Sequence, residues 1–129
     1  MGIQELVRSA DFKSEKHVPV IECPNGIKKG EYSTIEVSVG KEIAHPNTTE
    51  HYIGWISLYF KPASGKPVYN LGRVEFLAHG ESTEGPNKGP AYTNPVASFK
   101  VKLEEAGTLV AVSYCNIHGL WESQVEVNF

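Results

Sequence analysis

The sequence is poor in cysteine and methionine, has little net charge and contains no long apolar run, and each shortage excludes a class of protein. Its two cysteines, Cys23 and Cys115, allow at most one disulfide and form no Cys-x-x-Cys motif. This excludes a disulfide-rich scaffold, a dithiol redox motif and a Cys₄ metal centre. The net charge of -3 argues against nucleic acid as a partner, because nucleic-acid-binding domains usually present a basic face. No apolar run reaches the about 20 residues that cross a bilayer as a helix, so we expect no membrane partner.

The N-terminal stretch MGIQELVRSADF carries charges throughout and lacks the apolar centre of a signal peptide. We therefore expect a cytoplasmic protein. A chain of 129 residues is long enough for one hydrophobic core but short for two. We expect residues 1–129 to form a single domain.

The hydropathy pattern predicts an all-β chain of about seven short strands that form an antiparallel sandwich. Apolar residues alternate with polar ones or form short buried runs, and Gly, Pro and Asn separate these segments. Gly72 stands inside one run and predicts a β-bulge. A helical spacing occurs only in residues 3–10, which predicts a short N-terminal helix. The expected strands are 17–22, 34–39, 52–60, 68–78, 97–103, 108–114 and 125–129.

The stretch from Tyr114 to Trp121 holds a Cys-x-x-His pair, Cys115 and His118, at the expected end of a buried strand. The spacing lets both side chains reach one metal ion, and a thiolate suits zinc, copper or iron. A cysteine in a strand is more often a small core residue, so the pair needs further ligands to indicate a metal site.

Three other histidines supply such ligands. His45 and His51 bracket a loop that Pro46 stiffens and whose Asn and Thr side chains can bond local backbone. His17 stands at the start of an expected strand. Alone, each is a surface residue by default, but together with Cys115 and His118 they favour a metal site. His79, after an apolar strand, is expected to be structural or exposed, and Cys23, in a turn, is expected to take no part.

Glu15 and Lys16 directly precede His17. As loop charges they are unremarkable, but beside a metal ligand they gain possible roles. A cation near an open metal position attracts anions, and a carboxylate can occupy that position when the metal is oxidised.

Three segments together closely resemble the one-iron superoxide reductases, also called neelaredoxins. These are EKHVP at 15–19, HPNTTEH at 45–51 and SYCNIHGLW at 113–121, and the likeness spans nearly the whole chain. The resemblance implies an immunoglobulin-like β-sandwich or barrel and reduction of superoxide to hydrogen peroxide at one iron ion (Fe²⁺/Fe³⁺) per chain. It implies rubredoxin as electron donor and a homotetramer. The four-cysteine N-terminal domain of the two-iron relatives, the desulfoferrodoxins, has no counterpart in this sequence.

Carried over residue by residue, the resemblance implies that four imidazoles surround the iron and one thiolate lies axial to it. It also implies an open sixth position, which Glu15 fills in the oxidised enzyme. Because thiolate donation must be restrained, we expect backbone N–H groups between Asn116 and His118 to bond the sulfur. The implied ligands are His17, His45, His51, His118, Cys115 and, when oxidised, Glu15.

Several further roles follow around this implied site. Lys16 is expected to attract the anionic substrate, with Lys13 and Lys41 adding to its field. Trp121, Tyr114 and Pro46 are expected to pack around the site rather than to react.

Two alternatives belong to other classes. A blue-copper electron carrier is also a β-sandwich with Cys and His near its C-terminal end. Its usual axial Met is missing here, since Met1 is the only methionine, although Gln124 could replace it. The other alternative is a metal-free β-sandwich binding module in which the histidines are incidental.

Overall fold

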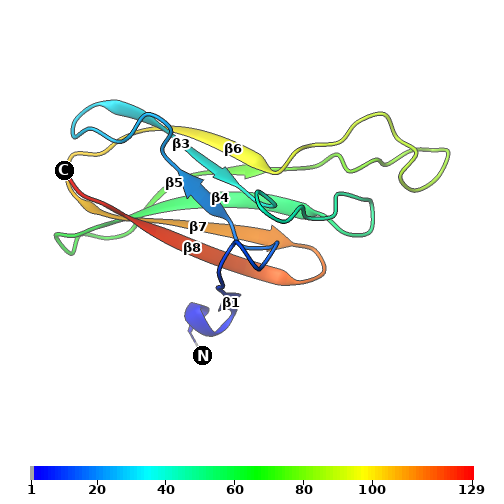
Figure 1. Cartoon of the computed structure of the whole chain (residues 1–129), viewed down its shortest axis with the longest axis horizontal. Helices are drawn as coiled ribbons and strands as arrows, with labels where there is room; N and C mark the ends of the chain where they lie inside the picture. The colour runs from blue at the N-terminus through cyan, green and yellow to red at the C-terminus, as the bar shows by residue number, and fades with distance from the viewer. Residues whose placement is uncertain (1) are drawn as a thin grey trace.

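The computed structural model describes residues 2–129 as two β-sheets that pack face to face (Figure 1). The larger sheet has five strands in the order β1-β8-β7-β4-β5, and the smaller has three in the order β2-β3-β6. All pairings are antiparallel except β1 with β8. The elements are η1 (Ile3–Glu5), β1 (Val7–Arg8), β2 (Val20–Glu22), β3 (Tyr32–Ser38), β4 (Ile53–Pro62), β5 (Tyr69–Glu75), β6 (Val96–Lys102), β7 (Gly107–Cys115) and β8 (Gly119–Val127).

The core lies between the two sheets and follows from the period-two pattern of the strands. Along β7 every second residue, from Gly107 to Cys115, is buried. Ile35 and Val37 of β3 face the same interior from the other sheet. Alternation of this kind places one face of each sheet against the core. The predicted all-β sandwich is therefore confirmed.

Each of the seven expected strands is present, with shifted ends. The largest difference is in β8, which begins at Gly119 rather than at 125 because it pairs along its whole length with β7. The predicted bulge is also present. Leu58 pairs with Gly72 and Tyr59 with Asn70, which leaves Leu71 as an extra residue in β5.

The helix predicted for residues 3–10 is correct only for Ile3–Glu5, which form a 3-10 helix. Val7 and Arg8 instead form a parallel strand beside Leu120 and Trp121. Ile3 and Leu6, two residues of the expected apolar face, are 64% and 52% exposed. A short helix needs an apolar face docked on other elements, and this segment has none.

The loops that carry the predicted ligands meet at one end of the sandwich. The β3–β4 loop and the β7–β8 turn both lie at the right of Figure 1, and the long β5–β6 loop extends beyond them. The β1–β2 connection ends in the buried residues His17, Val18 and Pro19. No helix in residues 2–129 has the length and hydropathy required to cross a membrane.

Candidate metal centre

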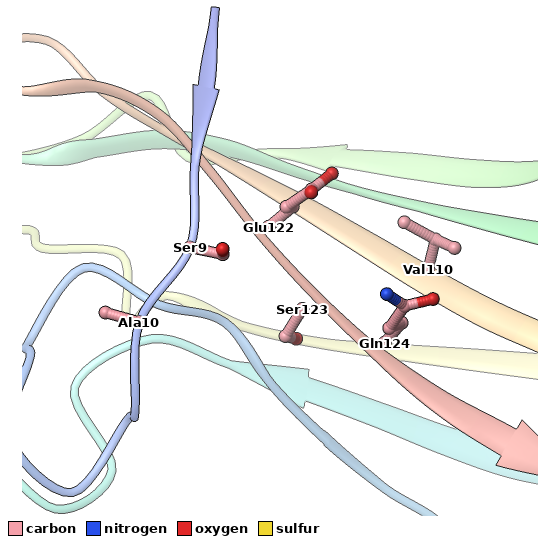
Figure 2. Close-up of a pocket in the computed structure, with 6 residues that line it drawn as sticks. All are labelled: Ser9, Ala10, Val110, Glu122, Ser123 and Gln124. Carbon is pink, nitrogen blue, oxygen red and sulfur yellow. The ribbon is translucent and has the colours of Figure 1, made fainter. Parts of the chain in front are cut away.

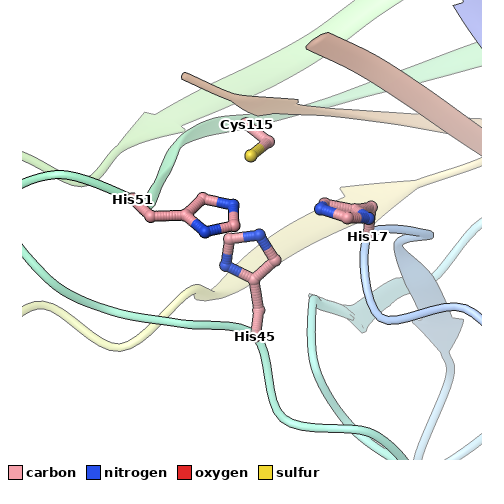
Figure 3. Close-up of side chains that lie close together, drawn as sticks. All are labelled: His17, His45, His51 and Cys115. Atoms are coloured by element: carbon pink, nitrogen blue, oxygen red, sulfur yellow. The ribbon is translucent and has the colours of Figure 1, made fainter. Parts of the chain in front are cut away.

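Four of the predicted ligands lie within reach of one another. One ligand atom from each of His17, His45, His51 and Cys115 lies within 4.8 Å of all the others, and Figure 3 shows their side chains turned toward a common point. His118 Nδ1 lies 3.1 Å from His17 Nε2, 3.2 Å from His51 Nε2 and 3.8 Å from Cys115 Sγ. Five side chains from three distant segments therefore surround one small volume.

The β7–β8 turn fixes two of these side chains. Cys115 is the last residue of β7, is 0% exposed and pairs with Gly119, whose φ of +83° closes the three-residue loop between them. The backbone N–H of His118 donates to Cys115 Sγ at 3.3 Å. This is one of the N–H···S bonds expected from the sequence. The N–H of Asn116 instead donates to the Tyr52 carbonyl at 3.2 Å.

Contacts with the large sheet hold His17. Its carbonyl accepts a hydrogen bond from the buried Ser113 hydroxyl at 2.9 Å. Its ring stacks on Trp121, with ring centroids 5.0 Å apart and planes at 14°. Trp121 Nε1 also donates to the His118 carbonyl at 3.2 Å. Trp121 therefore packs around the site, as predicted, and braces two of the five side chains.

His45 presents a nitrogen that lacks a protein partner. Its Nδ1 lies 2.7 Å from the Pro46 carbonyl and donates to it, so Nε2 is the free acceptor. Among residues 2–129, His45 Nε2 is the one buried side-chain nitrogen or oxygen without a hydrogen bond. Gly40 permits the tight approach of this loop, since a Cβ there would lie 2.8 Å from the His45 backbone nitrogen. A buried, unpaired acceptor calls for a partner, and a metal ion would provide one here.

Asn116 holds the backbone on both sides of His51. Its Nδ2 donates to the Glu50 carbonyl at 2.9 Å, and its Oδ1 accepts from the Tyr52 N–H at 2.9 Å. Within the loop between His45 and His51, the Thr48 hydroxyl accepts a hydrogen bond from the His51 N–H at 3.0 Å. The roles of Asn116 and Ser113 in holding the ligands were not predicted from the sequence. Two signals could have indicated these roles: Asn116 stands between the ligands Cys115 and His118, and Ser113 is a polar residue on the buried face of a strand.

The electrostatics favour the neutral form of three of the imidazoles. Burial, together with the charges of His17, His51 and Lys16, lowers the pKa of His45 to about 4, although the hydrogen bond to Pro46 opposes the shift. Burial is also the main cause that lowers the pKa of His17 and of His51. A neutral imidazole nitrogen is the form that binds a metal. The side chains are therefore ready for a cation at neutral pH.

Glu15 and Lys16 lie beside this cluster. Glu15 Oε1 accepts from the His17 backbone N–H at 2.8 Å and lies 2.5 Å from His17 Nδ1. Partial burial opposes ionisation of Glu15, but these two hydrogen bonds lower its pKa. The Lys16 charge contributes to the lowered pKa of three of the histidines, so it acts on the cluster electrostatically. None of the ion pairs between described residues involves Lys16.

Comparison with known proteins identifies the family of this chain. A profile of the desulfoferrodoxin family matches residues 9–124. The chain belongs to this family. It is 57% identical to the superoxide reductase of Pyrococcus furiosus over 123 residues, covering 95% of this chain and 97% of that protein. It is 53% identical to the neelaredoxin of Megalodesulfovibrio gigas over 127 residues, covering 98% of each chain. The structure of the superoxide reductase (neelaredoxin) of Archaeoglobus fulgidus in the reduced form superposes with a TM-score of 0.90 at 53% identity, covering 96% of this chain and 99% of that one.

The donor set fits the iron site that membership of the desulfoferrodoxin family indicates. Imidazole and thiolate ligands together suit iron, and the unpaired His45 Nε2 is available to bind a cation. Cys23 and His79 lie outside the group of ligand atoms, as predicted. Burial raises the pKa of the Cys23 thiol, which keeps it protonated and unreactive.

The structure contradicts one expectation near the site and weakens one alternative. Gln124, considered as an axial copper ligand, lines a different pocket with Ser9 and Ala10 (Figure 2). It lies five positions along β8 from Gly119, or about 17 Å at strand spacing. Lys41 does not add a free charge to the field of Lys16, because its ammonium pairs with Glu22. Because Gln124 lies far from the cluster, the blue-copper alternative loses its axial ligand.

Cobalt binding tests whether Cys115 supplies the thiolate. We expect Co²⁺ added to metal-free protein to produce an intense near-ultraviolet thiolate charge-transfer band, because the sulfur lies beside the four imidazoles. Cys115→Ser should abolish this band, since an alcohol does not donate as a thiolate does. Cys23→Ser is the matched control and should leave the band unchanged, whereas loss of the band in that variant would contradict the assignment.

Proposed function

We propose that this chain, as one domain of residues 1–129, is a superoxide reductase that reduces superoxide to hydrogen peroxide at one iron ion. The ligands would be His17, His45, His51, His118 and Cys115. The observation that carries the proposal is the convergence of four imidazoles and one thiolate at one end of the sandwich. The names of the relatives support the same chemistry.

When bound, the iron would supply the one electron that, together with two protons, converts superoxide into hydrogen peroxide. The side chains prepare the site for this reaction. The N–H of His118, 3.3 Å from Cys115 Sγ, withdraws electron density from the sulfur and moderates its donation. Trp121 covers one face of His17 and keeps water from that side. His118 is exposed whereas Cys115 is buried, so the ligand cluster is open to solvent on a side away from the sulfur.

We propose that Lys16 attracts superoxide and that Glu15 ligates the oxidised iron. The ammonium of Lys16 acts on three histidines of the cluster, so it also acts on an anion that approaches them. In the present structure Glu15 bonds the N–H groups of His17. Ligation would require its carboxylate to leave His17 Nδ1.

Other parts of the proposal rest on the family resemblance. We infer one iron per chain, rubredoxin as electron donor and a homotetramer. The cytoplasmic location stays a prediction from the N-terminal composition.

Metal analysis and rapid mixing test the function. We expect the protein as purified to contain iron, and the reduced protein to oxidise within milliseconds of mixing with superoxide while peroxide forms. Copper in place of iron, or no metal, would contradict the proposal. So would oxidation that yields no peroxide.

Lys16→Ala tests electrostatic attraction of the substrate. We expect the second-order rate with superoxide to fall roughly tenfold at low ionic strength and less at high ionic strength, because salt screens the field. Lys29→Ala is the matched control. Lys29 is exposed in the β2–β3 loop, at the opposite end of β3 from the ligand loop. Equal rates for Lys16→Ala and the unsubstituted protein at every salt concentration would refute the role.

Two substitutions of Glu15 separate ligation from orientation of His17. Glu15→Ala removes both roles, whereas Glu15→Gln keeps a carbonyl that accepts from His17 but removes the anionic ligand. If Glu15 ligates the oxidised iron, both variants change the visible spectrum of the oxidised protein and largely keep the rate of superoxide reduction. An unchanged oxidised spectrum in Glu15→Gln would restrict Glu15 to orienting His17.

A further inference from the structure

His79 is a buried histidine that contacts the loop between His45 and His51, which we call the ligand loop. Its side chain is outside the group of ligand atoms, and the residue is 3% exposed. Its ring lies flat on Tyr52, with centroids 3.9 Å apart and planes at 14°. Tyr52 follows His51 in the chain, so this stack abuts one end of the loop between His45 and His51.

Both ring nitrogens of His79 face oxygen atoms that can only accept. Nε2 lies 2.7 Å from the Phe76 carbonyl, and Nδ1 lies 3.0 Å from Asn47 Oδ1. Asn47 Nδ2 donates to the Thr93 carbonyl at 2.9 Å. Turning the amide the other way would place Oδ1 against this carbonyl, and both are acceptors. A neutral imidazole has one N–H and would leave one of its contacts without a proton. The two contacts are both hydrogen bonds only when His79 is doubly protonated.

The surroundings compensate a buried positive charge, which would otherwise be costly. The ring face of Tyr52 attracts a cation stacked on it. Glu81 lies close by, and its carboxylate accepts the backbone N–H of His79 at 2.7 Å. This hydrogen bond is the main cause that lowers the pKa of Glu81, and the charge of His79 adds to the effect. Two hydrogen bonds and an aromatic face would stabilise an imidazolium at this position, and the Glu81 carboxylate is held next to it.

The network beyond His79 ties the ligand loop to the sheets. Asn47 lies between His45 and His51, and it joins His79 to Thr93 through one amide. Thr93 in turn donates to the Ala78 carbonyl from both its N–H, at 2.8 Å, and its hydroxyl, at 2.9 Å. The loop has two further contacts, from Asn87 to Thr49 and Glu50 and from Asn116 to the Glu50 carbonyl, and both are exposed. The hydrogen bonds of Asn47 are partly buried. Such bonds resist water better than exposed ones, so the His79 network is the stronger constraint.

We propose that His79, as a buried imidazolium, is a positioning residue that holds Asn47 and so fixes the loop from His45 to His51 in its metal-binding shape. The proposal rests on the proposed function, since it takes His45 and His51 as metal ligands. It assigns to the fifth histidine a role outside the metal. The ring acts through its charge and through its two N–H donors.

Three measurements test the proposal without superoxide turnover. Nitrogen-15 NMR of zinc-loaded protein at pH 7.5 should show both ring nitrogens of His79 protonated, and Asn47→Ala should remove one proton. In metal-free protein, His79→Phe keeps an aromatic ring on Tyr52 but removes both donors. It should accelerate hydrogen exchange of amides 47–51, and it should weaken Co²⁺ binding about tenfold, the loss typical when a residue that orients metal ligands is changed. His79→Gln restores one donor and should fall between these results.

Asn47→Ala and Asn70→Ala form the matched pair. Asn47→Ala should reproduce the faster exchange and weaker cobalt binding, and the double variant with His79→Phe should add little, because both act through one contact. Asn70 also bonds a backbone N–H, that of Gly72 in β5, and its alanine variant should change neither reading. If His79→Phe does not fold, Asn47→Ala carries the test.

The outcomes separate the proposal from the proposed function. A neutral His79 ring at pH 7.5 would overturn the proposal, as would unchanged exchange and cobalt affinity in both His79→Phe and Asn47→Ala. Failure of the unsubstituted protein to bind cobalt would instead refute the metal site. In that case the hydrogen-exchange readings, which are made on metal-free protein, would still decide how His79 acts on the loop.

Discussion

The buried sulfur of Cys115 is the fixed point from which the site is built. β7 pairs on one side with β4 and on the other with β8, and its register with β8 is regular up to Cys115. Alternation along β7 turns Cys115 to the same side as Leu109 and Ala111, which are buried in the core. A shift of one residue in this register would turn the sulfur to the other face of the sheet. The position of the thiolate is thus determined by the same packing that stabilises the fold.

The imidazoles are brought to that sulfur by contacts that do not involve a metal. Ser113, two residues before Cys115 on the same face of β7, holds the carbonyl of His17. Asn116, one residue after it, holds the backbone on both sides of His51. A ligand shell supported in this way needs little rearrangement when an ion binds, so less conformational entropy is lost. The unpaired His45 Nε2 is the cost of this preorganisation.

The sequence predicts the parts of this arrangement that depend on local pattern. Period-two runs predict the strands, and the spacing of Cys115 and His118 predicts that both reach one point beside a tight turn. The parallel strand β1 has no such signal, since two residues at a sheet edge carry no period and a helical spacing in residues 3–10 predicts a helix instead. Pairings between distant segments are equally hidden. The ties from Asn47 to His79 and from Asn116 to Glu50 depend on which loops meet at one end of the sandwich, and the resemblance to a family supplies the ligands but not these supports.

The charges around the cluster explain why such a site suits an anion in an acidic protein. Neutral imidazoles add no charge, and a single thiolate only partly balances a divalent metal ion, so the centre stays positive when loaded. Lys16 adds a further charge on the side of the ligand loops. A protonated His79 would add another from behind the loop, partly balanced by Glu81. Glu15 is the acidic group in direct contact with the cluster, and its carboxylate is committed to His17. The net charge of -3 is thus a property of the whole chain, whereas the field that a small anion meets at this end is set by the nearby cations. Low dielectric around the buried ligands strengthens that local field relative to distant, solvated charges.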